Sequence, residues 1–132
     1  MSRRKILVVE DNKMNLELVS DILTARGYEV IQASEGRQAL ELARRLLPDL
    51  ILMDIQLPEM DGLEVTRRLK GAADTRDIEV VALTAHAMRG DRERAQAAGC
   101  AGYIAKPIDI HEFTGIIEGY LKGEAREQTD ER

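Results

Sequence analysis

The feature that most constrains the fold of this chain is a regular alternation between short apolar runs and longer stretches of helical periodicity. Continuous apolar runs at 5–10, 49–54, 79–84 and 102–105 are typical of strands buried on both faces of a sheet, and the mixed segment 29–33 suits an edge strand. Helical patterns lie at 13–26, 35–46, 60–70, 88–98 and 110–121. The alternation predicts an α/β fold of five βα units, (βα)5, with a parallel sheet covered by helices on both faces.

Length and composition restrict the class of protein. The 132 residues, of which 44% are hydrophobic, predict one domain over 1–122, followed by a polar, disordered tail at 123–132. The net charge of −5 argues against nucleic-acid binding, and no apolar run approaches the length of a membrane span. The single cysteine, Cys100, excludes an internal disulfide and fits a small buried apolar role. We expect a cytoplasmic protein with no membrane or nucleic-acid partner.

Polar side chains follow four of the predicted strands. Glu10 and Asp11 stand at the end of the first strand, and Asp54, Thr84 and Lys106 stand at or just beyond the ends of three others. In doubly wound sheets, ligands bind beyond the carboxyl ends of the strands. The sequence therefore predicts that three acids, a hydroxyl and an ammonium meet at one edge of the sheet.

This combination indicates metal-assisted phosphoryl chemistry. Two carboxylates about 4 Å apart repel by roughly 4 kcal/mol at an effective dielectric near 20, so Glu10, Asp11 and Asp54 need a counter-charge, and Mg²⁺ is the natural one. The alternative is that the first pair merely caps the next helix. Asp54 can act as a nucleophile toward phosphorus, while Lys106 neutralises charge and Thr84 donates a hydrogen bond.

The chain resembles the receiver domains of two-component response regulators from about Lys5 to Leu121. Four ordered motifs carry the resemblance: Val8-Val9-Glu10-Asp11-Asn12, Leu52-Met53-Asp54-Ile55-Gln56-Leu57-Pro58 with Met60-Asp61-Gly62, Leu83-Thr84-Ala85, and Ile104-Ala105-Lys106-Pro107. The resemblance implies a flavodoxin-like sheet of strand order 2-1-3-4-5. It departs from many members in having Glu10 where they have an aspartate.

The resemblance also implies roles for the site residues. Asp54 would be the phosphoacceptor and a Mg²⁺ ligand, Asp11 a direct ligand, Glu10 a ligand through water, and the backbone carbonyl of Gln56 a further ligand. Thr84 and Lys106 would hold the phosphoryl group. Such a protein is no enzyme toward other substrates, since it catalyses only its own phosphorylation and slow dephosphorylation.

The resemblance implies that signalling follows from a switch that couples Thr84 to Tyr103. The alternative is that Tyr103 is an ordinary half-buried core aromatic. The switch would reshape the face formed by 88–98, 102–105 and 110–121, and a downstream protein would bind to that face. The regulator itself would be a monomer or weak dimer.

The phosphodonor would be a sensor histidine kinase or a histidine phosphotransfer protein in a phosphorelay. The sequence is most similar to single-domain cell-cycle regulators and hybrid-kinase receivers. Candidates for donor specificity are Lys13, Asn15, Glu17 and 108–110. His86 either controls the access of water to the phosphoaspartate or is a plain surface histidine.

Two other functions compete with this interpretation. Haloacid-dehalogenase-type phosphatases also phosphorylate an aspartate, but they need a second aspartate as general acid where this chain has Gln56. A pseudo-receiver would be a binding module that works without phosphorylation and would tolerate loss of Asp54, Thr84 or Lys106, all of which are present.

Overall fold

The structure is a computed structural model that describes residues 4–57, 59–84, 89–106 and 108–122. The predicted tail at 123–132, His86 and Pro107 lie outside the described residues. None of the described helices has the length and apolar character needed to cross a bilayer.

The sheet has five parallel strands in the order β2-β1-β3-β4-β5, which confirms the predicted topology. The strands are β1 (Lys5–Val9), β2 (Glu29–Ala33), β3 (Leu50–Asp54), β4 (Glu79–Thr84) and β5 (Gly102–Ala105). Apart from the more exposed β2, they carry the apolar runs seen in the sequence, and β3 is buried along its whole length. The predicted strands 5–10 and 49–54 are each shortened by one residue at one end.

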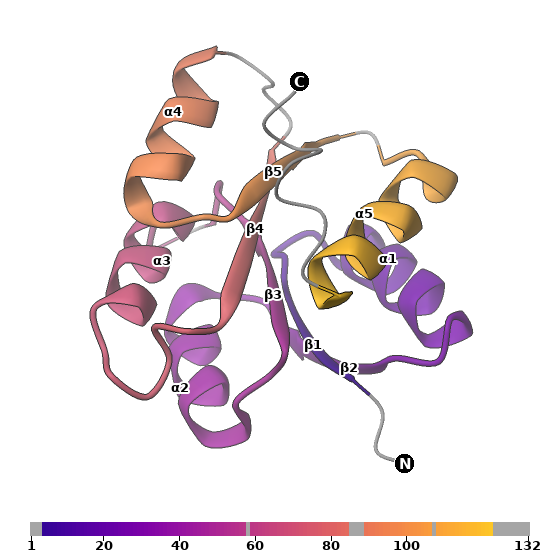
Figure 1. The fold of residues 1–132 in the computed structure, drawn as a ribbon, viewed down its shortest axis with the longest axis horizontal. Coiled ribbons are helices and arrows are strands. Elements are labelled where there is room, and N and C mark those ends of the chain that lie inside the picture. Colours follow the sequence, from indigo (N-terminus) through magenta and orange to yellow (C-terminus); the bar gives the residue numbers. More distant parts are fainter. Residues whose placement is uncertain (1–3, 58, 85–88, 107, 123–132) are drawn as a thin grey trace.

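Helices cover both faces of this sheet (Figure 1). The helices are α1 (Lys13–Ala25), α2 (Gly36–Leu46), α3 (Gly62–Lys70), α4 (Arg89–Ala98) and α5 (Ile110–Lys122). Helices α1 and α5 lie on one side, and α2, α3 and α4 lie on the other. Side chains of successive strand residues point to opposite faces, so Leu7 and Val9 join the core under α2–α4, whereas Ile6 and Val8 join the core under α1 and α5.

Capping residues decide where the helices begin. The stretch 60–70 was predicted as helix, but α3 begins at Gly62 because the Asp61 side chain accepts a hydrogen bond from Leu63 N at 2.8 Å. At the start of α5, Asp109 Oδ1 accepts a hydrogen bond from Glu112 N at 3.0 Å. Side-chain caps thus mark the first residues of α3 and α5.

Helix α2 ends in a way that the sequence did not indicate. Leu47, its C-cap, has a left-handed backbone with φ of 47°, a conformation that glycine usually supplies. The Leu47 N–H donates to Ala43 O at 3.0 Å, and its side chain is 53% exposed. The chain therefore leaves α2 through a residue whose left-handed backbone is strained.

Candidate functional site

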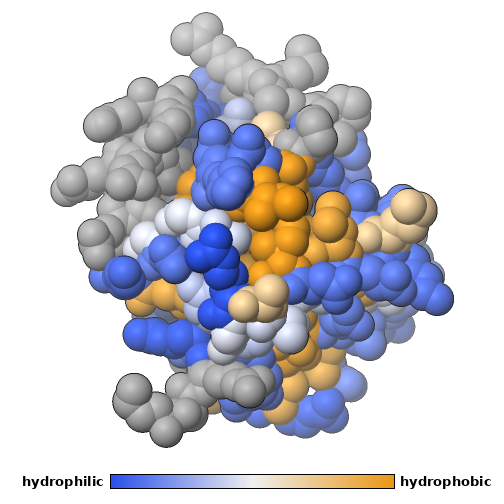
Figure 2. Space-filling view, turned by 90° about the vertical axis from the view of Figure 1, so that its right-hand side faces the viewer, coloured by the Kyte–Doolittle hydropathy of each residue, from blue (hydrophilic) through white to orange (hydrophobic). Residues whose placement is uncertain are grey.

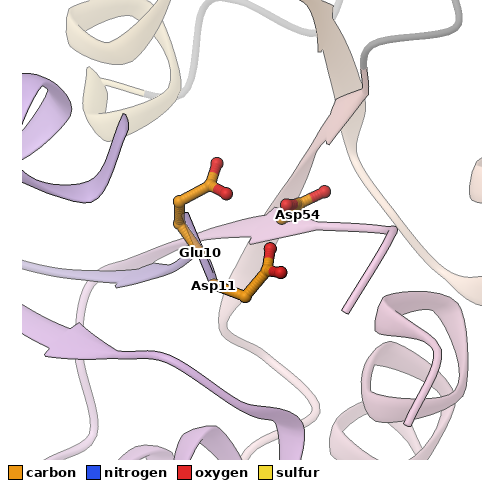
Figure 3. Close-up of side chains that lie close together, drawn as sticks. All are labelled: Glu10, Asp11 and Asp54. Carbon is orange, nitrogen blue, oxygen red and sulfur yellow. The ribbon is translucent and has the colours of Figure 1, made fainter. Parts of the chain in front are cut away.

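Three carboxylates meet beyond the carboxyl ends of β1 and β3. Figure 3 shows Glu10 and Asp11 from the end of β1 beside Asp54 from the end of β3. One oxygen of each side chain lies within 4.8 Å of the others. Glu10 and Asp54 are buried, whereas Asp11 is exposed. The cluster therefore combines two desolvated carboxylates with one that faces water.

The sheet register explains this meeting. Strands β1 and β3 are neighbours, with Val9 paired to Met53, so the residues that follow emerge together. The chain continues from β1 alongside β2, because Glu10 N donates to Ala33 O at 3.0 Å. Asn12 then caps α1 through its side chain, which accepts from Asn15 N at 3.0 Å. The strand end and the helix start thus fix the acidic pair from both sides.

The Asp54 carboxylate is held on both oxygens. Oδ1 accepts from the backbone N–H of Gln56 at 2.9 Å, and Oδ2 lies 3.4 Å from the ammonium of Lys106. Burial and the neighbouring Glu10 raise the pKa of Asp54 from 3.8 to about 7, although the Gln56 N–H and the charge of Lys106 oppose this rise. Without a further cation, Asp54 is therefore much easier to protonate than an ordinary aspartate.

Lys106 joins this cluster from the end of β5. Its backbone N–H donates to Thr84 O at 2.7 Å, and its Nζ lies 2.7 Å from Glu10 Oε1. Burial lowers the pKa of Lys106, but the hydrogen bond to Glu10 and the charges of Asp54 and Glu10 outweigh it, so the pKa is raised overall. The ammonium therefore stays charged beside the acids.

The remaining predicted residues lie around this centre. Thr84 is fully buried at the end of β4, paired in register with Ala105. Tyr103 lies on β5 opposite Ala82 and is partly buried against the core under α2–α4. The guanidinium carbon of Arg92 lies 5.1 Å from the centre of the Tyr103 ring. Tyr103 thus lies between the core and Arg92, and both interpretations of it, switch and core aromatic, fit this position.

The donor set fits a hard divalent cation. Carboxylate oxygens and water are the ligands that Mg²⁺ prefers, and Mg²⁺ usually retains several waters. The exposed Asp11 leaves a water-facing side, and the three carboxylates exceed the charge that Lys106 alone balances. Gln56 adjoins the cluster, since its backbone N–H donates to Asp54 Oδ1, and its carbonyl as a ligand stays a prediction. The roles of the individual residues stay predictions.

Two residues of the quoted motifs make contacts with the site that the sequence analysis did not predict. Asn12 donates its backbone N–H to Glu10 Oε2 at 3.1 Å, and an asparagine just before a helical pattern is a signal for such a position. Gly62 lies against the acceptor strand, where a Cβ would meet Asp54 O at 2.2 Å. No local pattern indicates that contact.

Comparison with known proteins agrees with this geometry. The family model "Response regulator receiver domain" matches residues 6–118. The polar-differentiation response regulator DivK of Brucella ovis is 51% identical over 118 residues, which cover 89% of this chain and 96% of that protein.

Solved structures share the fold as well. The receiver domain of sensor histidine kinase PA1611 from Pseudomonas aeruginosa, described with a magnesium ion in its active site cleft, is 37% identical with a TM-score of 0.85 and covers 92% of this chain and 99% of its own. The receiver domain of a histidine kinase from Syntrophus aciditrophicus is 34% identical, with a TM-score of 0.84, and covers 91% of each chain. With the four motifs, the strand order and the acidic cluster in agreement, the chain belongs to the response regulator receiver domain family.

Proposed function

We propose that this response regulator accepts a phosphoryl group on Asp54 from a phosphohistidine donor, in a Mg²⁺-dependent reaction, and signals to protein partners by a conformational change. The observation that carries the proposal is the convergence of Glu10, Asp11 and Asp54 with the ammonium of Lys106. The receiver domain is assigned to residues 1–122, which include the whole family match at 6–118.

The reaction needs an ionised acceptor and neutralised charge. An Asp54 carboxylate oxygen bonds to phosphorus while the phosphorus–nitrogen bond breaks, and the electron pair of that bond returns to the donor imidazole. Lys106, 3.4 Å from Asp54 Oδ2, is placed to neutralise the phosphoryl oxygens, and the Thr84 hydroxyl to donate to them. The Gln56 N–H holds the other acceptor oxygen in position.

Mg²⁺ would be held by the carboxylates of Asp11 and Asp54 and the backbone carbonyl of Gln56, with Glu10 acting through water. When bound, the ion supplies positive charge that offsets the repulsion among carboxylates and phosphoryl oxygens. The PA1611 receiver, whose structure is described with magnesium in its active site cleft, supports this assignment.

Donor docking is assigned to the side formed by α1 and α5. Figure 2 shows an apolar area on this side of the molecule, bordered by hydrophilic residues. Met14, Leu18 and Ile110 are 81%, 49% and 50% exposed, and α1 begins two residues after Asp11. Exposed apolar side chains next to a reactive centre favour a protein donor, a kinase or a phosphotransfer protein, over a small molecule.

Output is assigned to the α4–β5–α5 face, through Thr84 and Tyr103. Thr84 ends β4 and Tyr103 lies on the neighbouring strand β5, so a shift of one is transmitted through paired strands. A phosphoryl group adds about −1.5 to −2 charges at neutral pH, enough to bias a two-state element that contacts it. The protein would act in the cytoplasm as a monomer or weak dimer.

The test is phosphorylation by acetyl phosphate, followed by intact mass. The wild type is expected to gain one phosphoryl group with Mg²⁺ and none with EDTA, and Asp54→Asn is expected to gain none. Asp49→Asn is the matched control, because Asp49 is an aspartate at the opposite end of β3, bound to Lys5 N at 2.8 Å. Labelling of Asp54→Asn equal to wild type would reject the proposal.

Partner binding and phosphate-ester turnover, measured beside this labelling, separate the rival functions. A pseudo-receiver would bind partners equally well with and without Mg²⁺ and beryllofluoride, and would not be labelled on Asp54. A phosphatase would turn over phosphate esters repeatedly, which the neutral side chain of Gln56 disfavours because it cannot act as a general acid.

A further inference from the structure

Among the described residues, the closest acidic partner of the Lys106 ammonium is Glu10 and not the acceptor Asp54. The distance from Nζ to Glu10 Oε1 is 2.7 Å, whereas the distance to Asp54 Oδ2 is 3.4 Å. The Glu10 side chain is 1% exposed and that of Lys106 is 18% exposed, so water screens this pair weakly. A short, charge-assisted hydrogen bond in such a setting is among the stronger polar contacts of a protein.

Glu10 is itself fixed, and it uses both carboxylate oxygens to achieve this. Oε1 accepts from Lys106, and Oε2 accepts from the backbone N–H of Asn12 at 3.1 Å. Asn12 is the N-cap of α1, so the Glu10 carboxylate is tied to the rigid start of a helix. The chain of contacts runs from α1 through Glu10 to the ammonium at the end of β5.

From these contacts we propose that Glu10 is a positioning residue: it anchors the Lys106 ammonium beside Asp54 before any phosphoryl group arrives. The inference rests on the proposed function and assigns Glu10 a task in addition to its predicted contact with the metal through water. An ammonium has three N–H donors, so Lys106 keeps its bond to Glu10 while another N–H turns to the phosphoryl group. Prior placement removes the cost of ordering a long, flexible side chain during the reaction.

The geometry also says which groups can replace Glu10. A carboxylate accepts at both ends, whereas the amide of glutamine accepts at one end only, so Glu10→Gln leaves either Lys106 or Asn12 facing an N–H group. Aspartate keeps the charge, but its side chain is shorter by one carbon–carbon bond, so its carboxylate reaches about 1.5 Å less far. Glu10→Gln therefore tests the anchor with the smallest change in shape.

The first test observes the anchor directly in metal-free protein, through the side-chain ammonium resonance of Lys106 in a ¹⁵N-labelled sample. Wild type is expected to show this resonance because the anchored ammonium exchanges its protons slowly. Asp54→Asn, the matched control, is expected to keep it, and Glu10→Gln is expected to lose it. Absence of the resonance in wild type, or its loss in Asp54→Asn with retention in Glu10→Gln, overturns the proposal.

The second test is a double-mutant cycle with Glu10→Gln, Lys106→Met and the pair, read as beryllofluoride affinity at Mg²⁺ concentrations that saturate each variant. Glu10→Gln is expected to weaken binding about tenfold when Lys106 is present and less than about twofold when it is replaced. Equal losses in both backgrounds overturn the proposal, because Glu10 then acts through the metal or the fold.

Thermal unfolding verifies that each variant is folded, and Glu10→Asp takes the place of Glu10→Gln if the latter is not. The cycle also separates this inference from the proposed function. If wild type binds no beryllofluoride in an Asp54-dependent manner, the proposed function itself fails; if it does bind but the cycle shows no coupling, only the anchor fails.

Discussion

Gly62 offers the sharpest test of how the fold holds the acceptor. It is the first residue of α3, and a Cβ built on it would lie 2.2 Å from Asp54 O and 2.7 Å from Ile55 Cα. Ordinary contact begins near 3.4 Å, so the backbone must open by about 1 Å. Both neighbours are main chain and cannot rotate away. We expect Gly62→Ala to cost about 3 kcal/mol, at the upper end of overpacking effects, and to lower Tm by about 10 °C.

The matched control is Gly115→Ala, the same substitution inside α5. Nothing lies within 4 Å of a Cβ built on Gly115, so alanine only gains helix propensity there. We expect it to stabilise the protein by about 0.5–1 kcal/mol.

Urea and thermal unfolding followed by circular dichroism measure both changes, and acetyl-phosphate labelling measures the effect on Asp54. Gly62→Ala should be labelled more slowly, because the displaced main chain is that of the acceptor itself. The reasoning would be refuted if Gly62→Ala were as stable as wild type. It would also be refuted if Gly115→Ala lost as much stability as Gly62→Ala.

Three further outcomes are expected. Leu47→Gly should stabilise the protein by about 1 kcal/mol, because it relieves a left-handed backbone and gives up a side chain that is already 53% exposed; a lower urea midpoint would contradict this. Asp54 has a folded-state pKa raised to about 7, so the folded metal-free protein binds this proton more tightly than the unfolded chain. This contribution to stability is fully present below about pH 3.8 and is lost as the pH rises through about 7, and Asp54→Asn should remove that part of the measured pH profile. Burial raises the pKa of Cys100 to about 11, so a thiol reagent near neutral pH should modify it only after unfolding, and rapid labelling of folded protein would show the burial to be wrong.

The predicted residues also explain why the site needs its whole fold. Glu10 and Asp54 are buried acids, and each has one local partner, the backbone N–H of Asn12 or of Gln56, while both share the distant ammonium of Lys106. Removing Lys106 would leave two desolvated carboxylates side by side, which is more costly than losing a surface ion pair. The strongest interactions of the site thus join the ends of β1, β3 and β5.

Much of this arrangement was predictable from the sequence, because strand burial and helical periodicity are local patterns. The continuous apolar run before Asp54 indicates a central strand, and its position at the end of that strand predicts the edge where the acids meet. The start of α3 was misplaced by two residues, because the hydrogen bond from Leu63 N to the Asp61 side chain sets the boundary and periodicity does not report it. The placement of Tyr103 against Arg92 had no sequence signal, since the contact joins two separate elements.

The sequence by itself determined the parallel α/β fold and the four strand ends that deliver acids, hydroxyl and ammonium, since both follow from the order of residues along the chain. Only the tertiary structure decided that Lys106 bonds Glu10 at 2.7 Å while it stands 3.4 Å from Asp54, and that Gly62 touches the acceptor's main chain. The physical reason is that hydrogen bonds and steric contacts depend on distances of tenths of an ångström. Glu10 and Lys106 are 96 residues apart in sequence, and only the packing of the whole sheet sets the distance between them.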